Sequence, residues 1–530
     1  MVGTALRRRK HWGWGYEDEQ PSAADVRVAA EGIRAHLGFG ADDVEEPVPL
    51  RDVELPRARL EPPPALAEIC SLDTYDRASH AYGKSYRDVV RGFRGRFDHA
   101  PDVVAFPRDA GEVEALLAWC ADRGAAAIPY GGGTSVVGGV EAAIGDGYSG
   151  AVTMDLGRLD RVLEVDRVSR AALIQAGATG PGLEDQLREH DLTLRHFPQS
   201  FQLSTLGGWI ATRAGGHFAT LYTHIDDLVE SVTAITPSGM LETRRLPGSG
   251  AGPSPDRMLI GSEGILGVIT EAWVRLQDRP AHRASAAVTF ADFGRGAEAV
   301  RALGQSGLYP ANCRLLDPAE AALTGASAEG ALLVLGFESA DHPVEPWMDR
   351  ALELAGDHEG MVGRRGGASG DDSVGTWKDV FLRAPYLRDT FVACGVISET
   401  FETAVTWDRF EALHSAVIEV TERALEETCG GGRVMCRFTH VYPDGPAPYF
   451  TVLAPAHRGS ELEQWDAIKA AASETILSAG GTITHHHAVG RDHRAWYDRQ
   501  RPPAFAQALR AAKASLDPAA VLNPGVLIDP

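Results

Sequence analysis

Cysteine is scarce in this chain, and its spacing is not that of a metal site or a disulfide framework. Six cysteines are scattered over 530 residues, and none belongs to a Cys-x-x-Cys pair. Zinc sites, iron–sulfur sites and disulfide scaffolds show close and recurrent cysteine spacing. Because disulfides persist mainly in oxidising compartments, we expect reduced thiols and a cytoplasmic protein.

Long apolar runs and an excess of positive charge are missing as well. No stretch reaches the about 18 consecutive apolar residues of a membrane span. Residues 1–10 carry charge with no apolar stretch behind it, unlike a secretory signal. With 51 Lys and Arg against 73 Asp and Glu, the formal net charge is −22. Such a surface repels nucleic acid, so no nucleic-acid partner is expected.

Strand and helix patterns alternate from about residue 101, which predicts an α/β unit. Ala110–Arg123 is a predicted helix, because its apolar residues fall on one face. Further along, 482–484 is predicted to be a strand. The stretch 360–375 is rich in glycine, and we expect either a mobile loop or a disordered insert there.

A glycine-rich loop follows the short strand predicted at 126–129. Glycines let backbone N–H groups approach a diphosphate, and hydroxyl groups add donors. The loop is neither GxGxxG nor a Walker loop, so neither NAD nor ATP is implied. Taken alone it could equally be a flexible turn. Its candidate cofactor contacts are Pro129, Gly131, Gly132, Gly133, Thr134, Ser135 and Val136.

Two later segments have a similar character. Residues 198–212 combine small hydroxylated residues with paired glycines, which suits a second wall around a long polar cofactor. Residues 261–270 form a third glycine-rich segment. The candidate contacts here are Pro198, Gln199, Ser200, Ser204, Thr205, Gly207, Gly208, Thr212, Gly261, Glu263, Gly264, Gly267, Val268 and Ile269.

Together the three segments resemble the FAD-binding domain of the vanillyl-alcohol oxidase superfamily. The resemblance implies that the first loop holds the FAD diphosphate, the second lies along the ribityl chain and isoalloxazine, and the third closes the adenine side. Many members attach the flavin through a histidine in or just after the first loop. Here Val136 and Val137 follow, with no His or Cys, so noncovalent FAD is expected.

Three consecutive histidines, His485, His486 and His487, form the fourth motif. Adjacent side chains on a strand point to alternate faces, so the three would not chelate one ion. No HxxxH pattern or carboxylate pair supports a metal, and we expect none. An imidazole pKa near neutrality suits the binding or protonation of an oxyanion. The alternative is a polar turn with one functional histidine or none.

The triplet, preceded by Gly-Gly-Thr-Ile-Thr, resembles the signature of the alkyldihydroxyacetonephosphate synthase family. The resemblance covers nearly the whole chain. Its other landmarks are residues 12–16, 76–83, 101–104, 128–136, 204–214, 225–229, 386–389, 398–403 and 407–409.

This resemblance implies an activity and a set of roles. The family uses FAD, without net redox change, to exchange the acyl chain of acyl-dihydroxyacetone phosphate for a fatty alcohol. By resemblance Arg388 binds the substrate phosphate, Tyr449 is a general acid/base with a lowered pKa, and Arg314 acts near the flavin. The histidine triplet would steady an oxyanion or shuttle protons. Thr439 matches a threonine on the strand leading to the tyrosine. Without the resemblance, Arg388 would be assigned a structural salt bridge to Asp389 or another carboxylate.

The implied fold class is α+β / α/β, with a two-part FAD-binding domain of vanillyl-alcohol oxidase type and an α+β cap. Expected partners are a phosphorylated acyl lipid and a fatty alcohol, with peripheral membrane contact and a homodimer. The expected divisions are an N-terminal helical and extended region at 1–100, an FAD-binding domain at 101–280, a substrate-binding cap at 281–462 and a C-terminal segment returning to the FAD domain at 463–530.

Two departures from the family pattern leave an alternative open. The family's Pro-Asp-Ser is Pro-Gln-Ser here, at 198–200, and the glycine after the triplet is Ala488. The alternative is an FAD-dependent D-2-hydroxyacid oxidase or dehydrogenase of the D-lactate type. Those enzymes carry Glu-His-Gly where this chain has His-His-Ala at 486–488. A flavin-binding protein without catalysis is a third interpretation.

Overall fold

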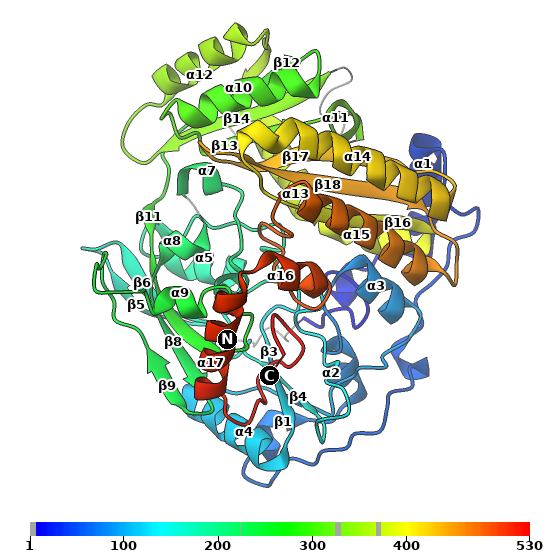
Figure 1. Cartoon of the computed structure of the whole chain (residues 1–530), viewed down its shortest axis with the longest axis vertical. Helices are drawn as coiled ribbons and strands as arrows, with labels where there is room; N and C mark the ends of the chain where they lie inside the picture. Colours follow the sequence, from blue (N-terminus) through cyan, green and yellow to red (C-terminus); the bar gives the residue numbers. More distant parts are fainter. Residues whose placement is uncertain (1–6, 223, 324–329, 367–372, 530) are drawn as a thin grey trace.

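The computed structural model describes residues 7–222, 224–323, 330–366 and 373–529. They form three large sheets with helices packed around them (Figure 1). Part of the stretch 360–375 is regular structure: a strand ends at Gly366 and a helix begins at Ser373, while 367–372 lie outside the described residues.

The first sheet has four strands in the order β1-β2-β4-β3, of which β2, β4 and β3 are parallel. Helix α4 connects β2 to β3, which lie parallel on either side of β4. It starts after the capping residue Asp109 and ends before Gly124, which takes a left-handed conformation. The helix predicted at Ala110–Arg123 is therefore confirmed. These elements are β1 (Cys70–Ser71), β2 (Val103–Ala105), α4 (Ala110–Arg123), β3 (Ala126–Tyr130) and β4 (Ala151–Asp155).

The second sheet is antiparallel, in the order β5-β6-β10-β8-β9. Short helices between its strands pack against this sheet. The strands are β5 (Val162–Asp166), β6 (Ala171–Gln175), β8 (Val229–Thr236), β9 (Gly239–Glu242) and β10 (Val268–Arg275). The helices are α5 (Gly180–Arg188), α6 (Leu206–Thr212), α7 (Ala219–Tyr222), α8 (Ile225–Leu228) and α9 (Asp256–Leu259), and a small ribbon pairs β7 (Leu192–Thr193) with β11 (Gln277–Asp278).

The third sheet forms a cap, uppermost in Figure 1, with seven antiparallel strands in the order β15-β12-β14-β13-β17-β18-β16. Helices pack on it and share one large apolar core with it. The strands are β12 (His282–Phe290), β13 (Asn312–Leu316), β14 (Ala331–Ser339), β15 (Met361–Gly366), β16 (Val396–Glu402), β17 (Arg433–Val441) and β18 (Pro446–Pro455). The helices are α10 (Phe293–Gln305), α11 (Pro318–Leu323), α12 (Glu345–Asp357), α13 (Ser373–Ala393), α14 (Trp407–Cys429) and α15 (Glu461–Ser478).

The two ends of the chain close the molecule. Helix α1 leaves the rest of the N-terminal region and packs against α13 of the cap, as Figure 1 shows at the right. A capping box formed by Ser22 and Asp25 starts it. At the other end, Ala127 of β3 bonds to the backbone of Val521 and Asn523. The helices of these regions are α1 (Ala23–Leu37), α2 (Thr74–Ser79), α3 (Tyr86–Phe93), α16 (Arg494–Gln500) and α17 (Pro503–Leu516).

The fold class expected from the sequence is confirmed: two sheets flank the glycine-rich loops, and an α+β cap covers them. The strand predicted at 482–484 is wrong. The segment from Gly481 to Val489 is irregular. The N–H of Thr482 bonds to the carbonyl oxygen of Ala404 and that of Ile483 to the side chain of Gln500, and the next N–H groups, at 485–487, bond to a buried carboxylate, so no strand ladder forms.

Candidate active site

A cavity of about 690 Å³ lies between the glycine-rich loops, the inner face of the cap sheet and helix α1. It brings together side chains that are far apart in the sequence. Of the predicted site residues, those that line it are Gly131, Gly132, Gly133, Thr134, Ser135, Val136, Pro198, Gln199, Ser200, Ser204, Thr205, Gly208, Thr212, Arg314, Arg388, Tyr449, His486 and His487.

The first loop packs against the second so closely that glycine is required. A Cβ atom on Gly131 would lie 2.3 Å from Thr205 Oγ1, and one on Gly132 would lie 2.1 Å from the carbonyl oxygen of Leu203. The hydroxyl of Thr205 is buried at the cavity wall and has no hydrogen-bond partner among the described residues. A buried hydroxyl needs a partner, and the phosphate oxygens of a bound FAD would supply one. The cradle therefore fits the cofactor that the sequence implies.

The third segment does not line the cavity. The Glu263 carboxylate accepts the N–H groups of Val489 (2.9 Å) and Gly490 (2.8 Å), just after the histidine triplet. Burial raises the pKa of Glu263 to about 7. Gly264 lies against Pro129, and Gly207 against Ala176. The candidates outside the cavity lining are Pro129, Gly207, Gly261, Glu263, Gly264, Gly267, Val268, Ile269 and His485.

Strand alternation explains how the cap supplies the opposite wall. Side chains two apart on a strand share a face. Along β18 these are Tyr449, Thr451 and Leu453, and the cavity-lining residues of β16 and β17 follow the same period. A register shift between Phe438 and His440 then turns two consecutive residues of β17 to the cavity. The lining residues of the other strands are Arg314, Ser398, Thr400, Arg437, Thr439 and His440.

Three guanidinium groups gather at this wall. Arg314 is 1% exposed, and burial lowers its pKa to about 9. Arg388 donates to the carbonyl oxygen of Lys84 at 2.7 Å, while its Nε has no partner among the described residues. Arg437 pairs with Glu320, the carboxylate of the cavity lining, and was not predicted from the sequence. The site therefore favours an anion despite the acidic surface of the protein.

Among the described residues Arg388 forms no salt bridge, so the alternative interpretation of this arginine is wrong. Asp389 pairs instead with Lys10 Nζ at 2.9 Å and accepts the N–H of Trp14. The adjacent Arg388 is left to face the cavity.

Tyr449 stands at the centre of the wall, 3% exposed. It is the direct neighbour of Arg437 on one side and of Glu402 on the other, and the Arg437 guanidinium lies 3.9 Å from its ring centroid. Burial raises the pKa of Tyr449. The lowered pKa expected from the resemblance is therefore wrong, because the cost of burying a phenolate outweighs the help of the nearby arginine. Tyr449 therefore keeps its proton at neutral pH.

Glu402, fully buried at the end of β16, organises the histidine triplet and was not predicted to do so. Its carboxylate accepts the backbone N–H groups of His485, His486 (3.1 Å) and His487 (2.8 Å), and the hydroxyl of Thr484 (2.7 Å). These donors and the nearby imidazoles hold its pKa far below the usual range, against the effect of burial. Burial lowers the pKa of His485 to about 3 and of His487 to about 4, and that of His486 also falls. The triplet is thus neutral at pH 7, and each imidazole presents one donor and one acceptor nitrogen.

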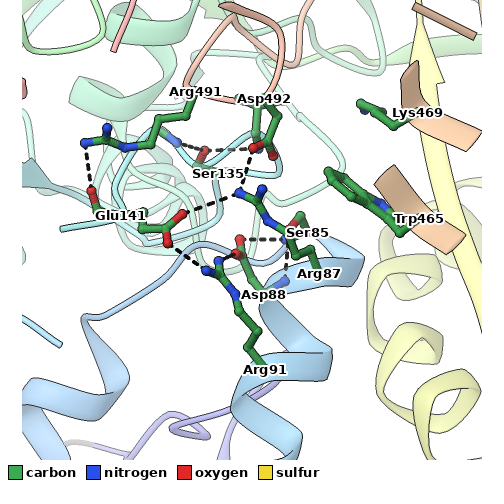
Figure 2. A network of polar contacts seen from close by, with 12 residues as sticks. Ser85, Arg87, Asp88, Arg91, Ser135, Glu141, Trp465, Lys469, Arg491 and Asp492 are labelled. Carbon is green, nitrogen blue, oxygen red and sulfur yellow. Dashed lines mark hydrogen bonds and ion pairs between the residues drawn. The ribbon is translucent and has the colours of Figure 1, made fainter. Parts of the chain in front are cut away.

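A second charge network fixes the first loop to the segment after the triplet (Figure 2). Glu141 accepts from Arg91 at 2.7 Å and from Arg87 at 3.4 Å, and Arg87 also bonds to Asp492 at 2.6 Å. The N–H of Arg491 reaches the carbonyl of Val137 at 2.8 Å. These contacts tie the first loop to the segment that follows the triplet.

Two family models match the chain: an FAD binding domain over residues 101–244, and the C-terminal domain of FAD linked oxidases over residues 279–527. The fold and the site therefore define a flavoenzyme built like the FAD linked oxidases, and the prediction that FAD is the cofactor is confirmed.

Comparison with known relatives shows which family of flavoenzymes this chain resembles. The alkyldihydroxyacetonephosphate synthase of Caenorhabditis elegans is 30% identical over 486 residues, which cover 86% of this chain and 80% of the relative. That of Trypanosoma brucei brucei is 28% identical over 581 residues, covering 100% and 94%. A solved alkyldihydroxyacetonephosphate synthase superposes with a TM-score of 0.82 at 24% identity, covering 97% of this chain and 98% of that one. This chain belongs to the alkyldihydroxyacetonephosphate synthase family, as its motifs predicted. A mitochondrial D-lactate dehydrogenase [cytochrome] of Arabidopsis thaliana is less similar, at 26% identity over 520 residues.

Proposed function

We propose that this chain exchanges the acyl chain of acyl-dihydroxyacetone phosphate for a fatty alcohol, forming the ether bond of an ether-lipid precursor. The observation that carries the proposal is the two-ended cavity. Arginines gather at one part of it, and the stripe Ala29, Gly32, Ile33, His36 and Leu37 of α1 lines another, beside Leu323, Leu387, Phe391 and Leu453. A phosphate and a long alkyl chain match these two parts.

The residues that line the cavity have the following proposed roles. Arg314, Arg388 and Arg437 bind the phosphate, and Tyr449 donates a hydrogen bond while keeping its proton. His486, neutral and at the cavity wall, accepts the proton of the incoming alcohol. When bound, FAD supplies a ring system that can accept and return an electron pair, so that the exchange leaves no net redox change.

The direct assay mixes purified protein with acyl-dihydroxyacetone phosphate and hexadecanol and measures the ether product by mass spectrometry. The same protein is mixed with D-lactate and with D-2-hydroxyglutarate under anaerobic conditions, and the flavin absorbance is followed. Ether formation without bleaching is expected. Bleaching by a hydroxy acid with no ether product would establish the alternative oxidase function. A small hydroxy acid would make no use of the apolar part of the cavity.

Access for lipids is proposed at the α1–α13 end. Leu387 lines the cavity and is 53% exposed, so the apolar lining continues to the surface there. No described helix is both long and apolar enough to span a bilayer. We propose peripheral contact with a membrane at this end, a cytoplasmic location and a homodimer. Co-sedimentation with lipid vesicles and light scattering test the first and third of these.

Gly32→Leu is expected to shorten the preferred alcohol. A Cβ at Gly32 would meet nothing within 4 Å, so a leucine there extends into the mouth of the cavity and also favours the helix. The ratio of kcat/KM for hexadecanol to that for octanol should fall by about tenfold, as for a few methylene groups displaced from an apolar pocket. Gly356→Leu is the control, because Gly356 is also helical with an open Cβ position but lies outside the cavity. Equal effects of the two variants would contradict the assignment of α1 to the lipid site.

A further inference from the structure

A chain of hydrogen bonds leads away from the cavity behind the histidine triplet. His486 lines the cavity, and its Nδ1 lies 3.0 Å from Nδ1 of His485. Nε2 of His485 lies 2.6 Å from the hydroxyl oxygen of Tyr442, which follows strand β17. The same hydroxyl is hydrogen-bonded to Nε2 of His224. Four side chains from three separate segments are thus linked end to end.

The donors and acceptors of this chain can all point in one direction with every group neutral. If His486 Nδ1–H donates to His485 Nδ1, then His485 Nε2–H donates to the Tyr442 oxygen and the Tyr442 hydroxyl donates to His224 Nε2. A neutral imidazole has one donor and one acceptor nitrogen, so this arrangement leaves Nε2 of His486 as an acceptor. When Nε2 of His486 takes up a proton, three transfers follow: from His486 to His485, from His485 to Tyr442 and from Tyr442 to His224. Every hydrogen bond then points the opposite way, and the chain must return to its first orientation before the next turnover.

The far end of the chain lies where a proton can leave. His224 is half-buried, and the neighbouring Asp226 and Asp227 oppose the lowering of its pKa by burial. Asp226 is held by Arg213 at 2.7 Å, and the side chain of Asp227 is 53% exposed. The chain therefore runs from a buried cavity to a half-buried histidine near two carboxylates.

The proposed function requires such a route. Exchange of an ester acyl group for an alcohol forms one C–O bond to the alcohol oxygen and breaks one C–O bond to the departing carboxylate. The alcohol loses its proton, and the fatty acid leaves as a carboxylate at neutral pH, so one proton must leave the site in every turnover. The cavity wall is apolar beside the alkyl chain, and Tyr449 already holds its own proton.

We propose that His486, His485, Tyr442 and His224 form a proton relay that carries the proton of the alcohol from the cavity to the surface. The proposal rests on the proposed function. His486 meets the substrate, while His485, Tyr442 and His224 pass the proton on without touching the substrate.

Tyr442→Phe removes the central hydroxyl and keeps the ring. We expect kcat to fall by roughly a hundredfold, at the lower end of what a positioned proton transfer contributes, with KM and FAD content unchanged. The solvent isotope effect on kcat should rise, because proton release becomes limiting. Tyr148→Phe is the matched control, since its hydroxyl bonds to the carbonyl oxygen of Ala520 at 2.7 Å outside the cavity. An unchanged kcat for Tyr442→Phe, or a parallel loss of FAD, would overturn the relay.

His224→Gln separates hydrogen bonding from proton transfer. The glutamine oxygen can accept from Tyr442 but cannot carry a proton onward. A fall in kcat as large as that of Tyr442→Phe is expected, with an unchanged melting temperature. Activity close to that of the wild type would mean that the hydrogen bond alone matters, and would overturn the relay.

A readout independent of turnover decides whether the chain exists. In protein with ring-15N-labelled histidine, the nitrogen shifts report the tautomers of His485 and His486. Tyr442→Phe should change the shifts of both histidines, and Tyr148→Phe should change neither. Unchanged shifts in Tyr442→Phe would refute the hydrogen-bond chain, whether or not the wild type makes ether. A wild type that makes no ether would refute the proposed function, which is a separate result. Ligand atoms of His224, His440 and His485 lie within 4.8 Å of one another. Metal content is therefore measured on the same samples. If the wild type holds one equivalent of metal and His440→Ala has lost it, these histidines form a metal site and the relay is refuted.

Discussion

Arg388→Ala should reduce kcat/KM for the phosphorylated substrate by about 10²- to 10³-fold, while the FAD content of the purified protein stays at the wild-type level. Removing one partner of a buried, hydrogen-bonded charge pair costs about 2–5 kcal/mol. The Arg388 guanidinium faces the cavity, anchored by one bond to the carbonyl oxygen of Lys84 and within 3.5 Å of Thr400 Oγ1. Substrate binding depends on it, whereas the glycine loops hold the cofactor.

Two further variants make this test specific. Arg388→Lys keeps the charge but loses the planar fork, so it should recover only part of the lost kcat/KM. Arg383→Ala removes an exposed arginine from the same helix and should change neither substrate binding nor FAD content. Flavin absorbance per mole of protein and initial rates with acyl-dihydroxyacetone phosphate provide the measurements. Equal losses of FAD and substrate binding in Arg388→Ala would show that the arginine supports the fold.

Glu402→Gln is expected to lower both stability and activity by the largest margin outside the substrate contacts. The amide has one acceptor oxygen where the carboxylate offers two, and its NH2 group faces donors that need an acceptor. Buried N–H groups left without partners should cost about 2–4 kcal/mol of unfolding free energy. Because the Glu402 carboxylate holds the backbone of the triplet, the substitution should displace the histidines. A displacement of about 1 Å can lower kcat by about a hundredfold.

The effect of Glu402 on stability has a defined pH dependence. Its pKa in the folded protein lies well below its ordinary value of 4.5, so its stabilising effect is present above about pH 4.5 and is lost as the pH falls through the folded pKa. The difference in melting temperature between wild type and Glu402→Gln should therefore be largest from pH 5 upward and shrink in acid. Glu419→Gln, on the exposed face of α14, serves as the control. Equal melting temperatures at pH 7 for wild type and Glu402→Gln would contradict the role of this carboxylate.

The sequence predicted the parts of the fold that depend on local patterns. Helix α4 and the loop after β3 are specified by capping residues, helical periodicity and glycine spacing within a few residues. The arrangement of the triplet could not be predicted in this way, because Glu402 lies 83 positions before His485. The motif at 398–403 that contains Glu402 was visible in the sequence. Nothing near it in the sequence indicated that the Glu402 carboxylate would accept three backbone N–H groups.

The cavity lining shows the same limit. Residues 29, 32, 33, 36 and 37 have the spacing of one helical face, and the sequence does not say which surface that face covers. His440 is an ordinary member of a strand until the register shift in β17 is known, and Arg437 is one until the cap sheet is placed over the cavity. The prediction of a lowered pKa for Tyr449 was wrong because a motif match identifies the residue but does not show how deeply it is buried.

Both ends of the described chain fasten the first glycine-rich loop, and this has a consequence for biosynthesis. Arg9 bonds to the carbonyl oxygen of Gly132, while Asn523 bonds to that of Gly139, 384 positions after it. Synthesis from the N-terminus therefore leaves the loop without its final ties until the last of these residues has emerged from the ribosome. The loop is therefore completed only after the strands of the cap, which precede Asn523 in the sequence, have been made.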